Sequence, residues 1–258
     1  MSVVPVEIAG VRIDLRLRGP APAALDRYAP FARWTGAADF TLELMPGRLE
    51  SRGRYTRRVV VKEGRWRVEG VEHLGWIDPA SGVGEAVADP SLLVVDGLVR
   101  AAVARHVLSC GGVLLHAAAV RVDGRAHLFP ARSGAGKSTL AGLAGDVLAD
   151  EVVAILPALG GYTARATPWW RSVGGAAPLA GVYALAWEGE AVTPLARPAA
   201  LRQLVTNLVL QLDGPAERER ALTAAARIAA VVPFARFAFR TDSDVDALLR
   251  GPALSRTG

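Results

Sequence analysis

A glycine-rich segment that ends in a lysine, residues 131–139 (ARSGAGKST), has the composition and spacing of a phosphate-binding loop of the Walker A type. Small residues let successive backbone amides curve around phosphate oxygens, and the helix that follows presents its positive end to the same anion. In such a loop the Lys137 ammonium would bridge the β- and γ-phosphates, and the Ser138 hydroxyl would bind magnesium. The segment predicts binding of a nucleoside triphosphate through Ser133, Gly134, Ala135, Gly136, Lys137, Ser138 and Thr139.

Two positions of the loop stand out. Lys137 and Lys62 are the only lysines among 30 basic residues, and a compact ammonium approaches phosphates more closely than a forked guanidinium. Ala131, in contrast, occupies the place of the first glycine in the pattern GxxxxGKS/T. A methyl group there would cost about 1 kcal/mol if the loop needed a positive φ at this position.

An acidic pair, Asp150-Glu151, follows the loop at the end of a strand predicted over 146–149. Phosphoryl transfer needs carboxylates that hold magnesium beside the β/γ bridge and orient the attacking hydroxyl. Two adjacent carboxylates can divide this work, one contacting the metal and the other accepting the proton. A solvated Asp-Glu turn is the alternative interpretation.

Two further sites carry reactive or aromatic side chains. His116 lies on an apolar predicted strand, where a single histidine is more often a hydrogen-bonded core residue than a functional one. Trp169 and Trp170 precede Arg171, and such a group could stack an adenine or clamp a peptide. A buried aromatic anchor with a surface arginine is the interpretation that we favour for this group.

The elements that must position these residues follow from the hydrophobic pattern. Strands are predicted over 113–122 and 125–130, joined by a hairpin turn at Asp123-Gly124, and the second strand leads into the loop. A short helix is predicted over 137–144. Further helices are predicted from the spacing over 201–212, over 215–231 and near 244–250, with a strand over 234–239.

The chain before these elements predicts a β-rich region. Strands are expected within 6–17 and 40–44, and a hairpin over 58–68 turns at Glu63-Gly64. Residues 77–89 predict a loop, and an apolar helical face follows from Pro90 to Gly111. We therefore expect an N-terminal accessory region over 1–89 and a nucleotide-binding domain over 90–258.

Composition narrows the class of protein. The 258 residues are 51% hydrophobic and 21% charged, which is typical of a globular protein. Neither a membrane span nor a secretory signal is evident, and Cys110 is the only cysteine, so we expect a cytoplasmic protein. The net charge of +5 is spread along the chain, which does not favour a nucleic-acid binder.

The residues 115–117 (LHA), 133–139 (SGAGKST) and 148–151 (LADE) together resemble the core of the HPr kinase/phosphorylase superfamily. That superfamily shares its fold with ATP-dependent phosphoenolpyruvate carboxykinase, and the resemblance covers about residues 111–155. It implies an α/β fold with a P-loop kinase core, in which a mixed sheet carries flanking helices. It also implies that His116, Lys137, Ser138, Asp150 and Glu151 surround the phosphates and magnesium.

The resemblance implies a magnesium-dependent kinase that moves the γ-phosphoryl group of ATP or GTP to a hydroxyl of a peptide, protein or small molecule. We do not find the N-terminal regulatory domain or the C-terminal signature loop of true HPr kinases in this sequence, so we do not expect phosphorylation of HPr itself. The closer likeness is to shorter HPr kinase-like proteins, some of which modify a peptide serine. Members of the family often assemble, which implies a homo-oligomer.

Two other functions compete with this kinase. The first is a catalytically impaired nucleotide-binding accessory protein of a peptide-modification pathway, because Ala131 and Glu151 both depart from the family pattern. The second is a carboxykinase acting on oxaloacetate, which is not favoured because the chain is short and shows no basic cluster for that substrate.

Overall fold

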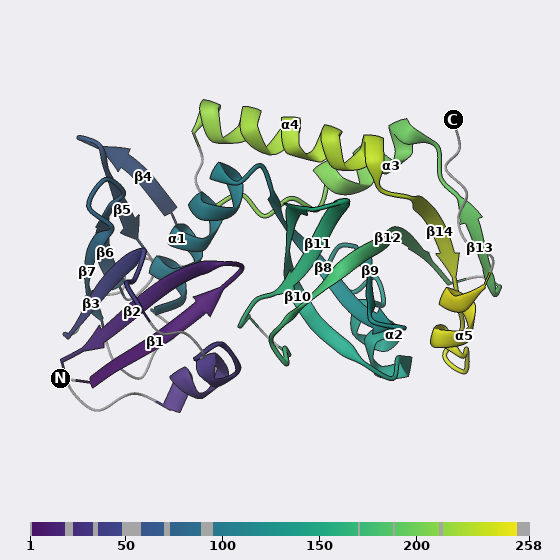
Figure 1. Ribbon diagram of the computed structural model, residues 1–258, viewed down its shortest axis with the longest axis horizontal. Coiled ribbons are helices and arrows are strands. Elements are labelled where there is room, and N and C mark those ends of the chain that lie inside the picture. The colour runs from purple at the N-terminus through teal and green to yellow at the C-terminus, as the bar shows by residue number, and fades with distance from the viewer. Residues whose placement is uncertain are drawn as a thin grey trace. The chain divides into compact units, whose positions relative to one another are not determined.

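The computed structural model describes residues 2–18, 23–32, 36–47, 58–69, 73–88, 95–169, 171–187, 189–211 and 214–251. Within them the chain has a mixed α/β structure of two seven-stranded mixed sheets with few helices, which confirms the predicted α/β class (Figure 1). Contacts divide the chain into two compact units, Met1–His106 with Leu210–Arg218 and Val107–Val209 with Glu219–Gly258. None of the helices in the described ranges is both long and apolar enough to cross a membrane.

The N-terminal unit is built on a sheet with the strand order β1-β2-β3-β7-β6-β5-β4. Two of its hairpins turn at Ala9-Gly10 and Glu63-Gly64, where both residues have positive φ, as the tightest hairpin turns require. The strands expected within 6–17, 40–44 and 58–68 are present as β1 to β5, and β6 and β7 are two strands that the sequence did not predict. The bounds of all seven are β1 (Ser2–Ile8), β2 (Val11–Leu17), β3 (Phe40–Pro46), β4 (Arg58–Lys62), β5 (Arg65–Glu69), β6 (His73–Asp78) and β7 (Val83–Ala88).

The loop predicted over 77–89 is wrong for most of its described residues, because 77–78 end β6 and 83–88 form β7. The prediction took its glycines as loop residues, but Gly84 lies inside β7 where neighbours approach closely. A Cβ at Gly84 would lie 2.8 Å from Leu42 Cδ2 and 2.9 Å from the Trp76 carbonyl oxygen. The glycine therefore serves close packing in the sheet. The predicted helix start at Pro90 lies outside the described residues.

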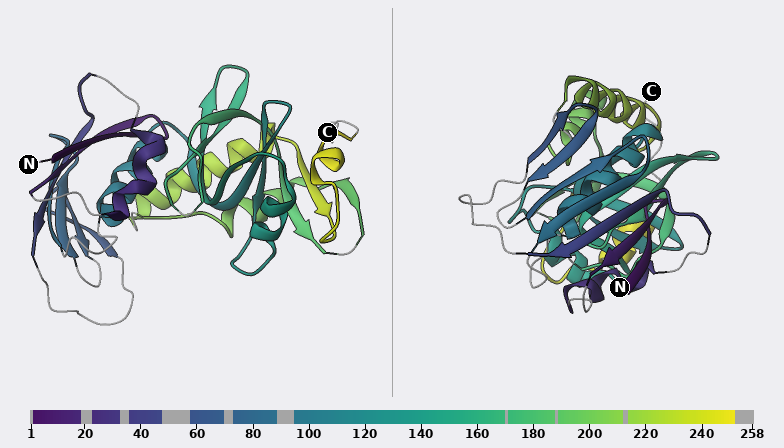
Figure 2. Two further views of the ribbon diagram at one scale, coloured as in Figure 1. Left: turned by 90° about the horizontal axis from the view of Figure 1, so that it is seen from below. Right: turned by 90° about the vertical axis from the view of Figure 1, so that its left-hand side faces the viewer.

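One face of this sheet is covered by the 3₁₀ helix η1 (Ala23–Phe31) and by α1 (Val95–Ser109) (Figure 2, left). Alternate residues of β2 are buried, as expected for a strand with one covered face. Asp96 at the start of α1 is buried, accepts a 2.7 Å hydrogen bond from the Tyr28 hydroxyl and pairs with Arg27 at 3.0 Å. This network links the two helices, and α1 ends before Gly111, as predicted.

The C-terminal unit contains a sheet with the order β11-β10-β8-β9-β12-β14-β13, and it curls so that β11 also pairs with β12. In it β12 runs parallel to β9 and to β14, and the other pairs are antiparallel. The bounds are β8 (Val113–Val122), β9 (Arg125–Pro130), β10 (Val147–Ala158), β11 (Gly161–Ala166), β12 (Ala176–Ala186), β13 (Ala191–Pro194) and β14 (Phe234–Ala238).

Four helices complete this part of the described chain, and most match the prediction. They are α2 (Lys137–Leu143), α3 (Arg197–Val205), α4 (Pro215–Val231) and α5 (Val245–Arg250). The helix predicted over 201–212 is wrong beyond Val205. Leu208 instead forms a β-bridge with Leu115, and the Val209 N–H donates to the Leu114 carbonyl, so tertiary pairing replaces the helical bonds. Leu212 lies outside the described residues.

An aromatic cluster fills the core under α2. Tyr183, Phe129 and Phe237 have ring centroids 5.2 to 5.9 Å apart, within the range of favourable ring contacts. At its border the Tyr183 hydroxyl lies 3.0 Å from His127 Nδ1. Burial, with a smaller contribution from Arg125, lowers the pKa of His127 to about 4. His127 is therefore neutral in the folded protein at pH 7.

This buried histidine predicts a specific loss of stability in acid. Below the ordinary histidine pKa of about 6.5 the unfolded chain binds a proton that the folded chain excludes down to a pH of about 4. Unfolding is therefore favoured by up to about 3 kcal/mol as the pH falls through this window. We expect His127→Asn, which keeps an acceptor near Tyr183, to lose that much less stability than wild type between pH 7.5 and 4.5 in urea unfolding. Parallel losses in the two proteins would contradict the assignment.

Candidate functional site

The predicted phosphate loop lies between β9 and α2, at an edge where several strands end. Because β9, β12 and β14 are parallel, their carboxyl ends meet at one edge of the sheet, where α/β proteins commonly bind ligands. Gly134 and Gly136 adopt φ values of 79° and 99°, which favour glycine. Ser133, Gly134, Ser138 and Thr139 are exposed, and Ala135 and Gly136 are partly buried. The loop is thus open to a ligand.

Ala131 causes no backbone strain. Among the described residues, the non-glycine positions with positive φ are Ala9, Glu63 and Asp123. Ala131 is not one of them, so a methyl group at the first position of the loop does not carry the expected cost of about 1 kcal/mol. The departure from the sequence pattern therefore does not distort this loop.

Lys137, the first residue of α2, is buried and points back into the loop. Its Nζ donates hydrogen bonds to the carbonyl oxygens of Ala131 at 2.8 Å and Arg132 at 3.0 Å. Burial lowers the pKa of Lys137, and the nearby carboxylates of Glu151 and Asp150 oppose this shift. The ammonium thus lies between the start of the loop and the acidic pair.

The acidic pair lies within β10 rather than at a strand end, so the predicted strand over 146–149 was too short. The apolar run after Glu151 continues the strand, and β10 pairs with β8 so that Asp150 faces Ala118 and Glu151 faces Ala117. The Asp150 N–H also donates to the Arg171 carbonyl at 3.0 Å. Pairing on both sides fixes the backbone that carries the two carboxylates.

Asp150 is a buried carboxylate that lacks a well-formed hydrogen bond within the described residues. Asp150 is 3% exposed, and neither of its side-chain oxygens accepts a hydrogen bond of normal geometry within the described part of the chain. Burial raises the pKa of Asp150, while a weak hydrogen-bonding interaction with Ser138 and the charges of Lys137 and Arg171 oppose the shift. A buried charged group is costly unless it is paired. The site is therefore suited to a cation or a hydroxyl donor at this carboxylate.

His116 and Glu151 form a second, more exposed pair. His116 Nε2 lies 3.7 Å from Glu151 Oε2, and the Glu151 side chain is 43% exposed. Burial and Lys137 lower the pKa of His116, against the opposing effect of Glu151. The imidazole is therefore neutral near pH 7. The structure brings all five predicted catalytic and metal-binding side chains together, namely His116, Lys137, Ser138, Asp150 and Glu151.

Trp187 is a residue of this site that the sequence did not reveal. It follows β12, and its Nε1 donates a 3.2 Å hydrogen bond to the Ala135 carbonyl inside the loop. Gln203 of α3 similarly donates to the Pro130 carbonyl, just before the loop begins. Both residues are far from the loop in sequence, and only the strand and helix arrangement brings them there. A spacing pattern could not have found them.

Trp169 and Arg171 agree with the interpretation favoured from the sequence, a buried aromatic anchor next to a surface arginine. Trp169 is 1% exposed and is therefore a buried anchor rather than a stacking surface. Arg171 is exposed, and its carbonyl binds the Asp150 backbone. Trp170 lies outside the described residues.

The described residues hold no preformed cluster of three or more His, Cys, Asp or Glu side chains that could bind a metal ion. The two carboxylates and the Ser138 hydroxyl nevertheless offer the oxygen ligands that magnesium prefers. A metal here would need ligands from phosphates as well, which is the usual way in which magnesium binds at triphosphate sites.

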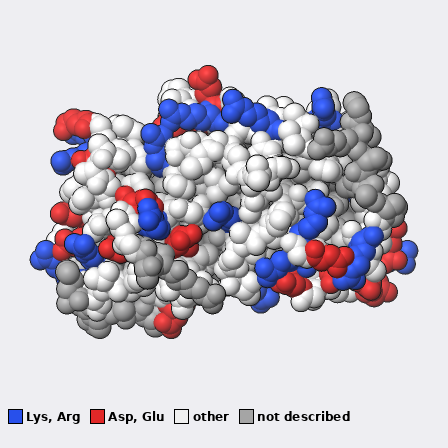
Figure 3. Space-filling model, viewed as in Figure 1, with Lys and Arg blue, Asp and Glu red and all other residues white. Residues whose placement is uncertain are grey.

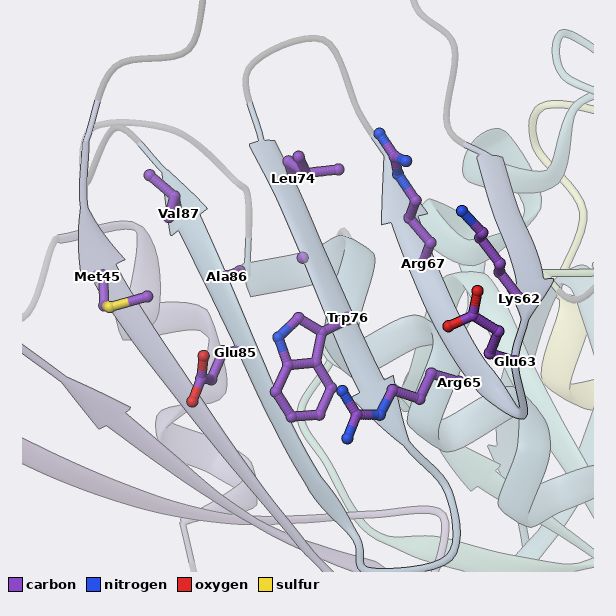
Figure 4. Close-up of a pocket in the computed structure, with 11 residues that line it drawn as sticks. Met45, Lys62, Glu63, Arg65, Arg67, Leu74, Trp76, Glu85, Ala86 and Val87 are labelled. Carbon is purple, nitrogen blue, oxygen red and sulfur yellow. The ribbon is translucent and has the colours of Figure 1, made fainter.

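A second hollow lies away from the predicted site. A cavity of about 460 Å³ in the N-terminal unit is lined by Trp76, Arg65 and their neighbours, and none of the predicted site residues lines it (Figure 4). The Arg65 guanidinium lies 4.7 Å from the centroid of the Trp76 ring. On the face in Figure 3, basic and acidic side chains are interspersed.

No protein-family model matches the chain, and no curated protein is similar to it at a significant level. The loop, the acidic pair and the residues that hold them are therefore the features that indicate a function.

Proposed function

We propose that the C-terminal unit binds a nucleoside triphosphate with Mg²⁺ and transfers the γ-phosphoryl group to a hydroxyl of a peptide, protein or small molecule, as an HPr kinase-like enzyme. The observation that carries this proposal is the carboxylate of Asp150, which is buried beside Lys137 and Ser138 without a well-formed hydrogen bond in the described residues. A glycine-rich turn without this function would have no reason to retain a buried carboxylate whose burial costs stability.

Separate groups of the site would bind the metal ion and the phosphates. Asp150 and Ser138 are close together and would hold Mg²⁺, which when bound would neutralise charge on the β- and γ-phosphates. The backbone amides of the loop and Lys137 would bind the phosphates themselves. This arrangement accounts for the burial of Asp150, because a carboxylate that holds a metal need not face the acceptor.

Glu151 would accept the proton of the acceptor hydroxyl. It is more exposed than Asp150 and can be reached from solvent, and His116 lies beside it. In the transfer the acceptor oxygen bonds to the γ-phosphorus, the bond from that phosphorus to the bridging oxygen breaks, and the nucleoside diphosphate leaves. The hydroxyl proton passes to Glu151, while neutral His116 positions the carboxylate.

Replacing Lys137 tests whether the loop binds a triphosphate. We expect Lys137→Ala to weaken MgATP binding about 10- to 100-fold, because a charge-assisted hydrogen bond contributes about 1.5–3 kcal/mol. Transfer to serine-containing peptides should fall about 10²- to 10³-fold. Lys62→Ala, which changes the only other lysine, is the matched control for calorimetry and for radiolabel transfer.

A Lys137→Ala protein that binds and transfers like the control would contradict the proposal. Wild-type protein that binds MgATP or MgGTP but labels no acceptor, across peptides and small molecules, would instead support the accessory role. Calorimetry and transfer are therefore both needed to separate the two functions.

Replacing Asp150 tests its role in metal binding and the loss of folding stability that its buried carboxylate causes. Asp150→Asn should weaken Mg²⁺-dependent nucleotide binding by about 10- to 100-fold, since even indirect metal contacts have effects of this size. The raised pKa of Asp150 means that its ionised form destabilises the folded protein as the pH rises above the ordinary aspartate value. Without metal, Asp150→Asn should therefore unfold at higher urea concentration than wild type at pH 7. A less stable variant with unchanged magnesium dependence would contradict both expectations.

Replacing Glu151 separates the base from the metal ligand. Glu151→Gln should lower kcat about 10²- to 10⁴-fold, the usual contribution of general base catalysis, and change MgATP affinity less than threefold. Steady-state kinetics with calorimetry on the same preparation will measure both quantities. If Glu151→Gln loses magnesium affinity while Asp150→Asn keeps it, the two roles must be exchanged.

A further inference from the structure

Trp187 contacts the phosphate loop at two adjacent residues. Its Nε1 donates to the Ala135 carbonyl at 3.2 Å, and its ring edge lies against Gly136. A Cβ added to Gly136 would lie 2.3 Å from Trp187 Cζ2, so only glycine allows this approach. The contact and the φ of 99° both require glycine at the same position.

The opposite side of Trp187 is anchored on the core. Its ring centroid lies 4.8 Å from that of Phe239, which is fully buried. The ring centroids of Phe239 and Phe237 are in turn 6.1 Å apart. The Phe239 N–H donates to the Ala186 carbonyl at 3.1 Å, which holds the ends of β12 and β14 together. Trp187 is nevertheless 46% exposed as a residue, so it does not serve only to fill space in the core.

The hydrogen bond from Trp187 fixes the direction of one peptide unit in the loop. All described peptide bonds are trans, so the Ala135 carbonyl and the Gly136 N–H point in opposite directions. With the carbonyl held by Trp187, the Gly136 N–H points away from the indole. Glycine alone would not select this orientation, because it adopts many backbone conformations at similar cost.

We propose that Trp187 is a positioning residue that holds the Ala135–Gly136 peptide unit in the orientation in which its N–H can bind a phosphate oxygen. This inference rests on the proposed triphosphate binding and adds a residue that no loop motif contains. Anions bound in such loops are held mainly by backbone N–H groups, so the orientation of one peptide unit affects affinity directly.

Two substitutions separate the hydrogen bond from the packing. Trp187→Phe keeps an aromatic ring against Phe239 and loses the N–H, and Trp187→Ala loses both. We expect MgATP affinity to fall about threefold in Trp187→Phe and about tenfold in Trp187→Ala, with kcat at saturating MgATP changed less than twofold. Trp76→Phe, in the N-terminal unit, is the matched control.

Hydrogen exchange over residues 134–137 without nucleotide tests the positioning directly. Both Trp187 variants should exchange faster there than wild type and the Trp76→Phe control. If wild-type protein binds no MgATP, the proposed function fails, but a difference in exchange still supports the role of Trp187 in holding the loop. Exchange that is unchanged in both variants would overturn the inference.

Discussion

The parallel pairing of β12 with β9 and β14 is the constraint on which the site depends. Parallel strands end at the same edge of a sheet, so the segments that follow them converge. The phosphate loop follows β9, Trp187 follows β12, and Phe239 follows β14. Without this pairing, the loop would lose its contact with Trp187 and, through Trp187, its support from Phe239.

Antiparallel pairing supplies the other half of the site. Ala117 of β8 pairs with Pro130, directly before the loop, and also with Glu151 of β10. One residue of β8 thus fixes how the acidic pair lies relative to the start of the loop. His116, the preceding residue, reaches the same place. The resemblance to HPr kinases implied that these residues converge, and the ladder gives the physical reason.

Local features of this chain were predictable from the sequence, and non-local ones were not. The hairpin at Asp123-Gly124 and the loop from Ala131 to Lys137 are encoded by neighbouring residues whose types determine their conformation. The extent of β10 beyond Glu151 and the early end of α3 at Val205 depend on partners far along the chain. Trp187 could not be found for the same reason, because its contact spans 52 positions.

Lys137 shows how the loop can be stable before a ligand arrives. An ammonium group has three N–H donors, and two of them bind the carbonyl groups of Ala131 and Arg132. Those carbonyls point toward the ammonium, so the N–H groups of the same peptide units point away from it. Trp187 acts in the same way on the Ala135 carbonyl at the other end of the loop. The Lys137 ammonium and the Trp187 indole thus fix the direction of three loop carbonyl groups before a ligand is present, which lowers the entropy cost of binding.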